Sequence, residues 1–280
     1  MNGHTRLFTL LTVATVMMAG CAGGEEGKKD FTDTMAHEHA GDHPVGNDVA
    51  WMEPSSPVKG EEVSYGTNHT AYLALPEGNE KPTSGLIVIH EWWGLNDNIQ
   101  AMARRLAGEG YMALAVDLYN GNVATTPDSA KSFMGTAMKN PDVGIGNLRE
   151  ALTYLKEQGA TKVGVIGWCF GGGWSLRTAL NFPEEIAATV IYYGQLETDP
   201  EQLKKLKMPV LGMFGEEDQG IPVEQVKQFE QVLDSIGVDA SINIYPNANH
   251  AFANPSGERY NEEAAKDAWE KTVAFLKGNL

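Results

Sequence analysis

The sequence predicts an α/β fold, with a mostly parallel β-sheet that carries helices on both faces. Three observations support this prediction. Apolar segments of strand length alternate with segments of helical pattern from about residue 60 onward. The segments 85–90 and 209–214 are apolar apart from His90 at the end of the first, which is typical of parallel strands buried on both faces. The apolar segment 161–166 leads into a glycine-flanked turn, Gly167-Trp-Cys-Phe-Gly171, from which a helix begins.

The predicted elements follow one another along the chain. Segments 61–67 and 69–75 are two short strands around Asn68, and we expect them to form a hairpin at an edge of the sheet. Asn96 is expected to cap a helix over 97–107, because its apolar side chains then share one face. The remaining strands are predicted at 85–90, 111–116, 161–166, 187–193, 209–214 and 240–245, and the remaining helices at 129–138, 142–158, 223–235 and 258–277 and directly after Gly171.

Length and charge limit the classes of function. The chain has 280 residues, and the part after its N-terminal tail is long enough for one α/β domain with a sizeable core. The formal net charge is -16 at pH 7. Such a charge argues against nucleic acid as a partner and against electrostatic binding to anionic membranes.

The first 20 residues are predicted to be a signal peptide. Arg6 precedes an apolar segment, 7–18, which is too short to span a bilayer. Met18-Ala-Gly-Cys21 resembles a bacterial lipobox, which implies cleavage before Cys21 and lipidation at that residue. Two or three acyl chains, palmitate among them, would anchor an exported protein stably in the membrane. Ala22 favours the outer membrane if the cell has one, and the alternative is an ordinary signal peptide with a chance cysteine.

Residues 21–60 are predicted to be a flexible tether that follows the lipidated cysteine, and residues 61–280 the folded domain. The tether is rich in Gly, Asp, Glu, His and Pro and has almost no apolar periodicity. His37, His39 and His43 lie close together in it, which allows a metal site as an alternative to a solvated linker. We favour the linker, because no cysteine and no folded context fix a ligand geometry.

Cys169 is the candidate nucleophile. The pattern Gly-x-nucleophile-x-Gly between a strand and a helix is the nucleophile elbow of α/β-hydrolases. No other such pattern with Ser or Cys occurs in the chain. If Cys21 is lipidated, Cys169 is the remaining thiol, and it is either buried and inert or kept for chemistry.

Asp218 and His250 are the candidate acid and base. Each follows a predicted strand, and the order Cys169, Asp218, His250 is the order of α/β-hydrolase triads. A histidine can take the proton of the thiol near neutral pH, and the carboxylate orients the imidazole. Glu216 and Glu217 compete with Asp218 for the acid role.

These motifs together resemble the dienelactone hydrolase family of α/β-hydrolases. The resemblance rests on five motifs in order, namely His90-Glu-Trp-Trp-Gly-Leu-Asn96, Asp117-Leu-Tyr119, the cysteine elbow, Gly215-x-x-Asp218 and His250-Ala-Phe-Ala253. It implies the α/β-hydrolase fold. It also implies that Glu91 lies beside the thiol, accepting or holding its proton, and that the backbone N–H groups of Trp92 and Phe170 form the oxyanion hole. His90 is expected to be structural.

One departure from the family concerns substrate binding. Dienelactone hydrolases hold the substrate carboxylate with two arginines, and the corresponding positions here are Gly121 and Asn254. Arg259 and Lys131 are candidate replacements that nothing in the sequence places. A bidentate arginine clamp contributes much to the recognition of an anionic lactone. The dienelactone substrate is therefore not transferred to this chain.

We conclude from the sequence that the chain is an exported, lipid-anchored hydrolase of carboxylic esters or lactones. The expected mechanism uses a Cys-His-Asp triad and an acyl-enzyme, with a small-molecule ester or lactone as partner and no metal or organic cofactor. One alternative is a binding lipoprotein of the cell envelope built on a catalytically inactive hydrolase fold. Another is a thiol redox protein, which usually needs a second cysteine nearby.

Overall fold

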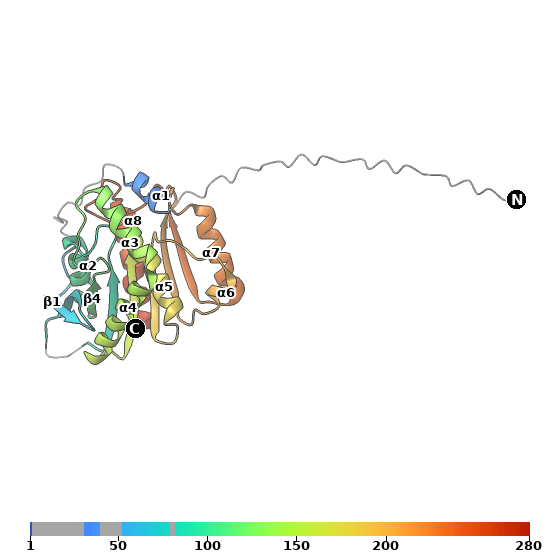
Figure 1. Cartoon of the computed structure of the whole chain (residues 1–280). Coiled ribbons are helices and arrows are strands. Elements are labelled where there is room, and N and C mark those ends of the chain that lie inside the picture. Colours follow the sequence, from blue (N-terminus) through green and yellow to red (C-terminus); the bar gives the residue numbers. More distant parts are fainter. Residues whose placement is uncertain (2–30, 40–51, 79–81) are drawn as a thin grey trace.

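An eight-stranded sheet forms the centre of the molecule in the computed structural model, which describes Met1 and residues 31–39, 52–78 and 82–280 (Figure 1). Its strand order is β1-β2-β4-β3-β5-β6-β7-β8. The strands are β1 Val58–Tyr65, β2 His69–Pro76, β3 Ser84–Ile89, β4 Met112–Val116, β5 Lys162–Trp168, β6 Ile186–Tyr192, β7 Val210–Gly215 and β8 Ala240–Tyr245. Strands β1 and β2 form the expected antiparallel hairpin, β2 pairs antiparallel with β4, and the remaining pairs are parallel.

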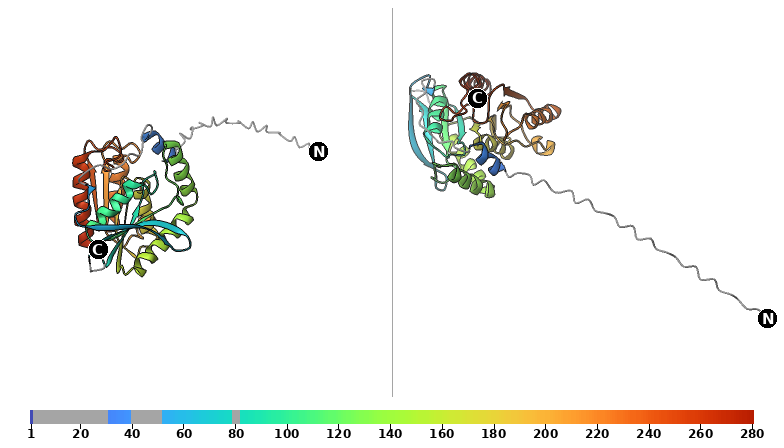
Figure 2. Two further views of the ribbon diagram at one scale, coloured as in Figure 1. Left: turned by 90° about the vertical axis from the view of Figure 1, so that its left-hand side faces the viewer. Right: turned by 90° about the horizontal axis from the view of Figure 1, so that it is seen from above.

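Helices cover both faces of this sheet. They are α1 Phe31–Glu38, α2 Asp97–Gly108, α3 Pro127–Lys139, α4 Pro141–Glu157, α5 Phe170–Asn181, α6 Pro200–Leu203, α7 Val223–Ile236 and α8 Glu262–Asn279. On one face α2 meets α8, where the Arg105 guanidinium lies 3.6 Å from the ring centre of Trp269. On the other face α4 packs on α5 through the close approach of Gly144 to the Trp174 ring. Figure 2 (left) shows α8 and the α3–α4 pair on opposite sides of the sheet.

The predicted fold class is confirmed, and most predicted elements lie within a few residues of the observed ones. The predicted cap is present, because the Asn96 side chain accepts the Ile99 N–H at 3.2 Å. Helix α6 was not predicted, since four residues are too few to show a helical period. Strand β1 begins at Val58, before the expected domain boundary at residue 61.

The largest difference from the sequence prediction lies in the expected tether, residues 21–60. Residues 31–38 form helix α1, and Met35 is wholly buried in the core. His39, directly after α1, is buried as well. The composition of the segment is polar, and for that reason the sequence did not indicate that it docks onto the domain.

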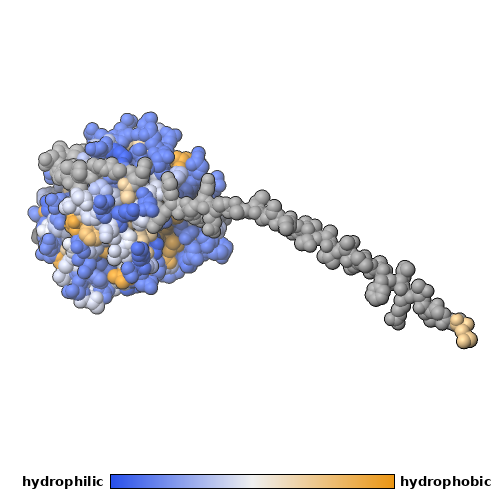
Figure 3. All heavy atoms as spheres, turned by 45° about the horizontal axis from the view of Figure 1, so that its top comes forward, coloured by the Kyte–Doolittle hydropathy of each residue, from blue (hydrophilic) through white to orange (hydrophobic). Residues whose placement is uncertain are grey.

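The described surface is mostly polar. Figure 3 shows small, scattered apolar patches on a hydrophilic face. Val123 and Val143 are the large apolar side chains that the domain exposes most among the described residues. Within the described residues no helix is both long and apolar enough to cross a membrane. The predicted signal peptide and the candidate lipidation site Cys21 lie outside the described residues.

Candidate active site

Cys169 lies in a strained turn between β5 and α5. Its backbone has φ 54° and ψ -117°, a conformation that is rare for residues other than glycine. The flanking glycines are required by close backbone contacts: a Cβ on Gly167 would lie 2.3 Å from the Gly171 oxygen, and one on Gly171 would lie 2.2 Å from the Ile89 oxygen. The Cys169 N–H donates to the Tyr192 oxygen at 3.0 Å. These contacts hold the thiol at the carboxyl end of the sheet.

Asp218 and His250 meet beside this turn, on the loops that follow β7 and β8. Asp218 Oδ2 lies 2.8 Å from His250 Nδ1, and both side chains are buried. The other carboxylate oxygen of Asp218 accepts the N–H groups of Gly220 and Ile221 at 2.8 and 2.9 Å. Both oxygens are thus fixed. Glu216 and Glu217, the alternative acids, are exposed.

The thiol of Cys169 faces the imidazole of His250. The Cys169 sulfur and a ring nitrogen of His250 lie within 4.8 Å of each other. Burial raises the pKa of the thiol, but the neighbouring His250 and His39 outweigh burial and lower that pKa to about 6. Burial lowers the pKa of His250, yet the charges of Asp218 and Cys169 raise it well above its ordinary value. A thiolate and an imidazolium therefore form the stable pair at neutral pH.

Glu91 lies behind the thiol at the end of β3 and is buried. Its Oε2 accepts the Asn254 amide at 2.5 Å and the Asn98 amide at 3.5 Å, and its Oε1 accepts the Tyr193 hydroxyl at 3.5 Å. Burial and the charge of Cys169 raise the pKa of Glu91 to about 8. Glu91 is therefore protonated at neutral pH. Of the two roles implied by the family resemblance, this state fits holding a proton rather than accepting one from the thiol.

His90, next to Glu91, is held by the backbone. Its Nδ1 donates to the Glu91 oxygen at 2.6 Å, and its Nε2 accepts the Leu118 N–H at 3.1 Å. Burial lowers the pKa of His90. With both nitrogens engaged, its ring fixes the turn after β3 against the turn after β4.

The backbone N–H groups of Phe170 and Trp92 are the two that the sequence predicts for an oxyanion hole. Phe170 is the first residue of α5, so its N–H has no acceptor within the helix. Trp92 follows Glu91 in the turn after β3, and Gly171 brings the start of α5 against that turn through its contact with the Ile89 oxygen. The two groups expected from the sequence thus belong to neighbouring backbone segments, on which an oxyanion hole can be built.

His39 also reaches the thiol, which the sequence reasoning missed. Its ring centre lies 4.3 Å from that of Trp92 and 5.3 Å from that of His250. One of its nitrogens, the Cys169 sulfur and a nitrogen of His250 all lie within 4.8 Å of one another. The sequence signal was the histidine-rich tract, which was interpreted as a linker because nothing in it indicated docking.

The cluster of His39, Cys169 and His250 has ligand types that zinc binds. Arg259 Nη2 lies 2.8 Å from Nδ1 of His39, and a guanidinium can only donate. The ring proton of His39 therefore sits on Nε2, and neither nitrogen offers a lone pair to a metal. Of the other histidines in the tract, His37 lies in α1 and His43 lies outside the described residues.

The two residues at the positions of the family's arginines form hydrogen bonds within the protein. Asn254 is buried; its amide binds Glu91, and its oxygen accepts the backbone N–H and the hydroxyl of Ser256 at 2.9 and 2.7 Å. Gly121 has φ +85° and donates its N–H to Asp117. The candidate replacements are engaged by the N-terminal segment: Lys131 pairs with Asp33, and Arg259 binds His39.

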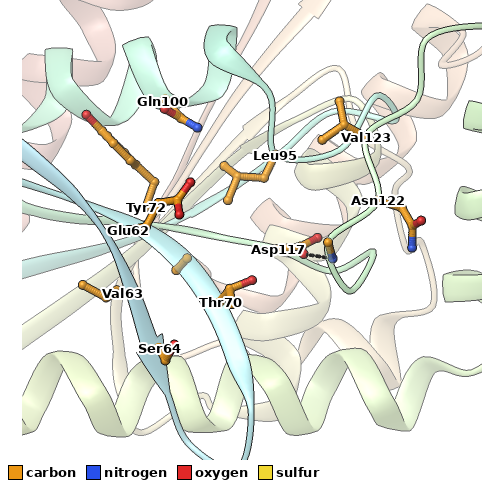
Figure 4. Close-up of a pocket in the computed structure, with 12 residues that line it drawn as sticks. Glu62, Val63, Ser64, Thr70, Tyr72, Leu95, Gln100, Asp117, Asn122 and Val123 are labelled. Carbon is orange, nitrogen blue, oxygen red and sulfur yellow. Dashed lines mark hydrogen bonds between the residues drawn. The ribbon is translucent and has the colours of Figure 1, made fainter.

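A pocket of about 440 Å³ lies beside this site, between the β1–β2 hairpin and the turns after β3 and β4 (Figure 4). Its lining includes the carboxylates of Glu62 and Asp117 and the side chains of Tyr72 and Leu95. Cys169 does not line it.

Comparison with known proteins identifies the family. The model of the dienelactone hydrolase family matches residues 69–280. The chain belongs to the dienelactone hydrolase family. It is accordingly a carboxylic-ester hydrolase with the α/β-hydrolase fold, as the sequence predicted.

Several members of the family are similar over most of their length. A protein of Saccharolobus solfataricus named "Putative carboxymethylenebutenolidase" is 34% identical over 251 residues, which cover 76% of this chain and 95% of that protein. The crystal structure of a Klebsiella pneumoniae protein named "Putative Dienelactone Hydrolase" matches with a TM-score of 0.71 and 28% identity, covering 79% of this chain and 99% of the other. A dienelactone hydrolase-like promiscuous phosphotriesterase from metagenomic libraries matches with a TM-score of 0.72 and 25% identity, covering 79% and 98%.

The low pKa of the thiol in this family member can be measured directly. The rate of Cys169 alkylation by iodoacetamide should rise with pH to a plateau, with a midpoint near 6 instead of the ordinary 9.0, because only the thiolate reacts. The His250→Ala variant should move the midpoint upward, since it removes the main cation. A wild-type midpoint near the ordinary value would contradict the ion pair.

Proposed function

We propose that the protein hydrolyses neutral carboxylic esters or lactones through an acyl-enzyme on Cys169. The observation that carries this proposal is the buried chain of contacts from Cys169 through His250 to Asp218, at the carboxyl end of a parallel sheet. Acyl transfer requires a nucleophile, a base within reach of the nucleophile and an acid that orients the base.

In the first step the Cys169 thiolate attacks the carbonyl carbon. A carbon–sulfur bond forms, and the carbonyl electron pair moves onto oxygen, where the N–H groups of Phe170 and Trp92 stabilise the charge. The tetrahedral intermediate then collapses and expels the alkoxide. His250, already protonated, donates its proton to this leaving group, so an alcohol departs and a thioester remains on Cys169.

In the second step water replaces the alcohol. His250, now neutral, takes a proton from the water as the water attacks the thioester, and Asp218 stabilises the imidazolium that forms. Collapse of the second intermediate breaks the carbon–sulfur bond. The acid leaves and the thiolate–imidazolium pair is restored. In a lactone the alcohol and the acid are the two ends of one product.

Glu91 has a supporting role in this mechanism. As a neutral acid at neutral pH it does not repel the thiolate, and its hydrogen bonds to Asn254 and Tyr193 keep it in place. Ionisation of Glu91 above its pKa of about 8 would put a second negative charge beside the sulfur. Activity should therefore fall as pH rises through that value.

The cellular location is a separate part of the proposal. Met18-Ala-Gly-Cys21, after a short apolar segment, supports export and lipidation at Cys21. The domain would then act at the surface of a membrane of the cell envelope, the outer membrane if one exists.

The roles of the three triad residues can be tested by substitution. Cys169→Ala, His250→Ala and Asp218→Asn should each lower kcat by about a thousandfold or more, and combining them should add little, because the triad acts as a unit. The measurement is kcat for a neutral ester, with folding checked by circular dichroism. Glu217→Gln is the matched control, because Glu217 is adjacent to Asp218 but exposed. Damage by Glu217→Gln with a mild effect of Asp218→Asn would reverse the assignment of the acid.

Substrate charge can be tested with a matched pair of lactones, one neutral and one carrying a carboxylate. We expect a higher kcat/KM for the neutral member, because two charge-assisted bonds of about 1.5–3 kcal/mol each are missing at Gly121 and Asn254. Asn254→Arg should not restore binding of the anionic member, since Asn254 holds Glu91. A clear preference of the wild type for the anionic lactone, lost at high salt, would contradict the proposal.

Lipidation can be tested by expression of the full chain in a bacterium with labelled palmitate. The wild type should carry the label and sediment with membranes, and Cys21→Ser should do neither. Recovery of the wild type as an unlabelled soluble protein would show that the lipobox interpretation is wrong.

A further inference from the structure

The catalytic centre is closed in this structure. The Cys169 side chain is 1% exposed and that of His250 is wholly buried. An ester has to bring its carbonyl carbon to the Cys169 sulfur, which solvent barely touches here. Some part of the molecule must therefore move before a substrate can react.

Helix α1 and His39 lie over this centre. Figure 2 (right), a view from above, shows α1 near the middle of this end of the molecule. Met35 is wholly buried and reaches the loop of the catalytic acid, since a Cβ on Gly220 would lie 2.1 Å from the Met35 methyl group. On the other side of α1, Asp33 forms an ion pair with Lys131 of α3.

Arg259 connects the end of α1 to the catalytic base. Its Nε donates to the His250 oxygen at 3.0 Å, and its two terminal nitrogens reach the Glu38 oxygen and Nδ1 of His39. The Arg259 guanidinium thus joins the loop of His250 to Glu38 and to the His39 ring. The hydrogen bond from Arg259 to the Glu38 oxygen depends on the helical backbone of α1, because this carbonyl belongs to the last turn of that helix.

The His39 side chain lies beside the Cys169 sulfur, to which an acyl group would be attached. Its ring lies against Trp92, next to His250, and within 4.8 Å of the Cys169 sulfur. An ester carbonyl attacked by Cys169 would have to lie between the sulfur and the N–H groups of Trp92 and Phe170. The His39 ring and a bound acyl group therefore exclude each other.

We propose that residues 31–39 are an intramolecular inhibitor, which docks through Met35 and Arg259 and places His39 in the acyl-binding site. The proposal rests on the proposed function of Cys169 as nucleophile. The apparent kcat/KM is then the value for the open enzyme multiplied by the fraction of molecules in which the segment is undocked. The ion pair of Asp33 and Lys131 joins side chains that are about half exposed and contributes little, so the buried contacts of Met35 decide the docking.

The test compares Met35→Ala with Met208→Ala in the full chain. Both remove a buried methionine, but Met208 lies before the amino end of β7, whereas the catalytic acid follows the carboxyl end of that strand. The readout is the plateau rate of Cys169 alkylation by iodoacetamide at high pH, where every molecule carries the thiolate and the rate reports access alone. Met35→Ala should raise this plateau about tenfold or more, and should raise kcat/KM by a similar factor. Met208→Ala should change neither beyond about twofold.

Two further variants keep the test decisive if Met35→Ala folds poorly. Asp33→Lys places a second lysine next to Lys131 on the surface and does not disturb the packing of the core. It should raise the plateau rate of alkylation by about two- to threefold. Adding Lys131→Glu should reverse that increase. His39→Ala should raise the plateau and also move the midpoint upward, because it removes a group that lowers the pKa of the thiol.

Equal plateaus in wild type, Met35→Ala and Asp33→Lys would overturn the inhibitor. A faster plateau without esterase activity in any variant would support the docked segment and contradict the proposed function. The two failures are thus distinguishable, because alkylation does not depend on turnover.

Discussion

The contact between the turn at Cys169 and the turn after β3 is the constraint on which the site depends. Gly171 lies so close to the Ile89 oxygen that no side chain fits between them, and Gly167 touches Gly171 in the same way. This packing forces Cys169 into a positive φ and puts its thiol at the end of the sheet. It also brings Glu91 and Trp92 next to the thiol, although they are about 80 residues earlier in the chain.

Charge balance explains how this buried site can hold a thiolate. Burial alone would keep the thiol neutral and would discharge the imidazole. The carboxylate of Asp218, fixed by two backbone N–H groups, stabilises the cation on His250, and that cation stabilises the thiolate. Glu91 remains neutral because burial and the charge of Cys169 raise its pKa to about 8, against the weaker opposing effect of His250.

The sequence predicts the parts of this site that depend on topology. The carboxyl ends of parallel strands lie at the same edge of a sheet, so residues that follow β5, β7 and β8 were expected to lie close together. Cys169, Asp218 and His250 are close together in the structure. Glu91 was expected beside the thiol because of the family resemblance, and it follows β3 closely. The sequence does not predict contacts that depend on side-chain reach, such as those of Tyr193 and Asn98 with Glu91, because many polar residues stand near strand ends. It also missed the docking of α1, since Met35 and His39, which are buried there, stand in a segment of polar composition.

The acyl-enzyme is the most direct test of the account. An activated neutral ester is mixed with the full chain, the reaction is stopped in acid within one turnover, and the protein is analysed by intact mass and peptide mapping. The account predicts a transient gain of one acyl group on the peptide that contains Cys169, which disappears as the ester is consumed. Steady turnover of the ester with no acyl group on Cys169 at any time would contradict it.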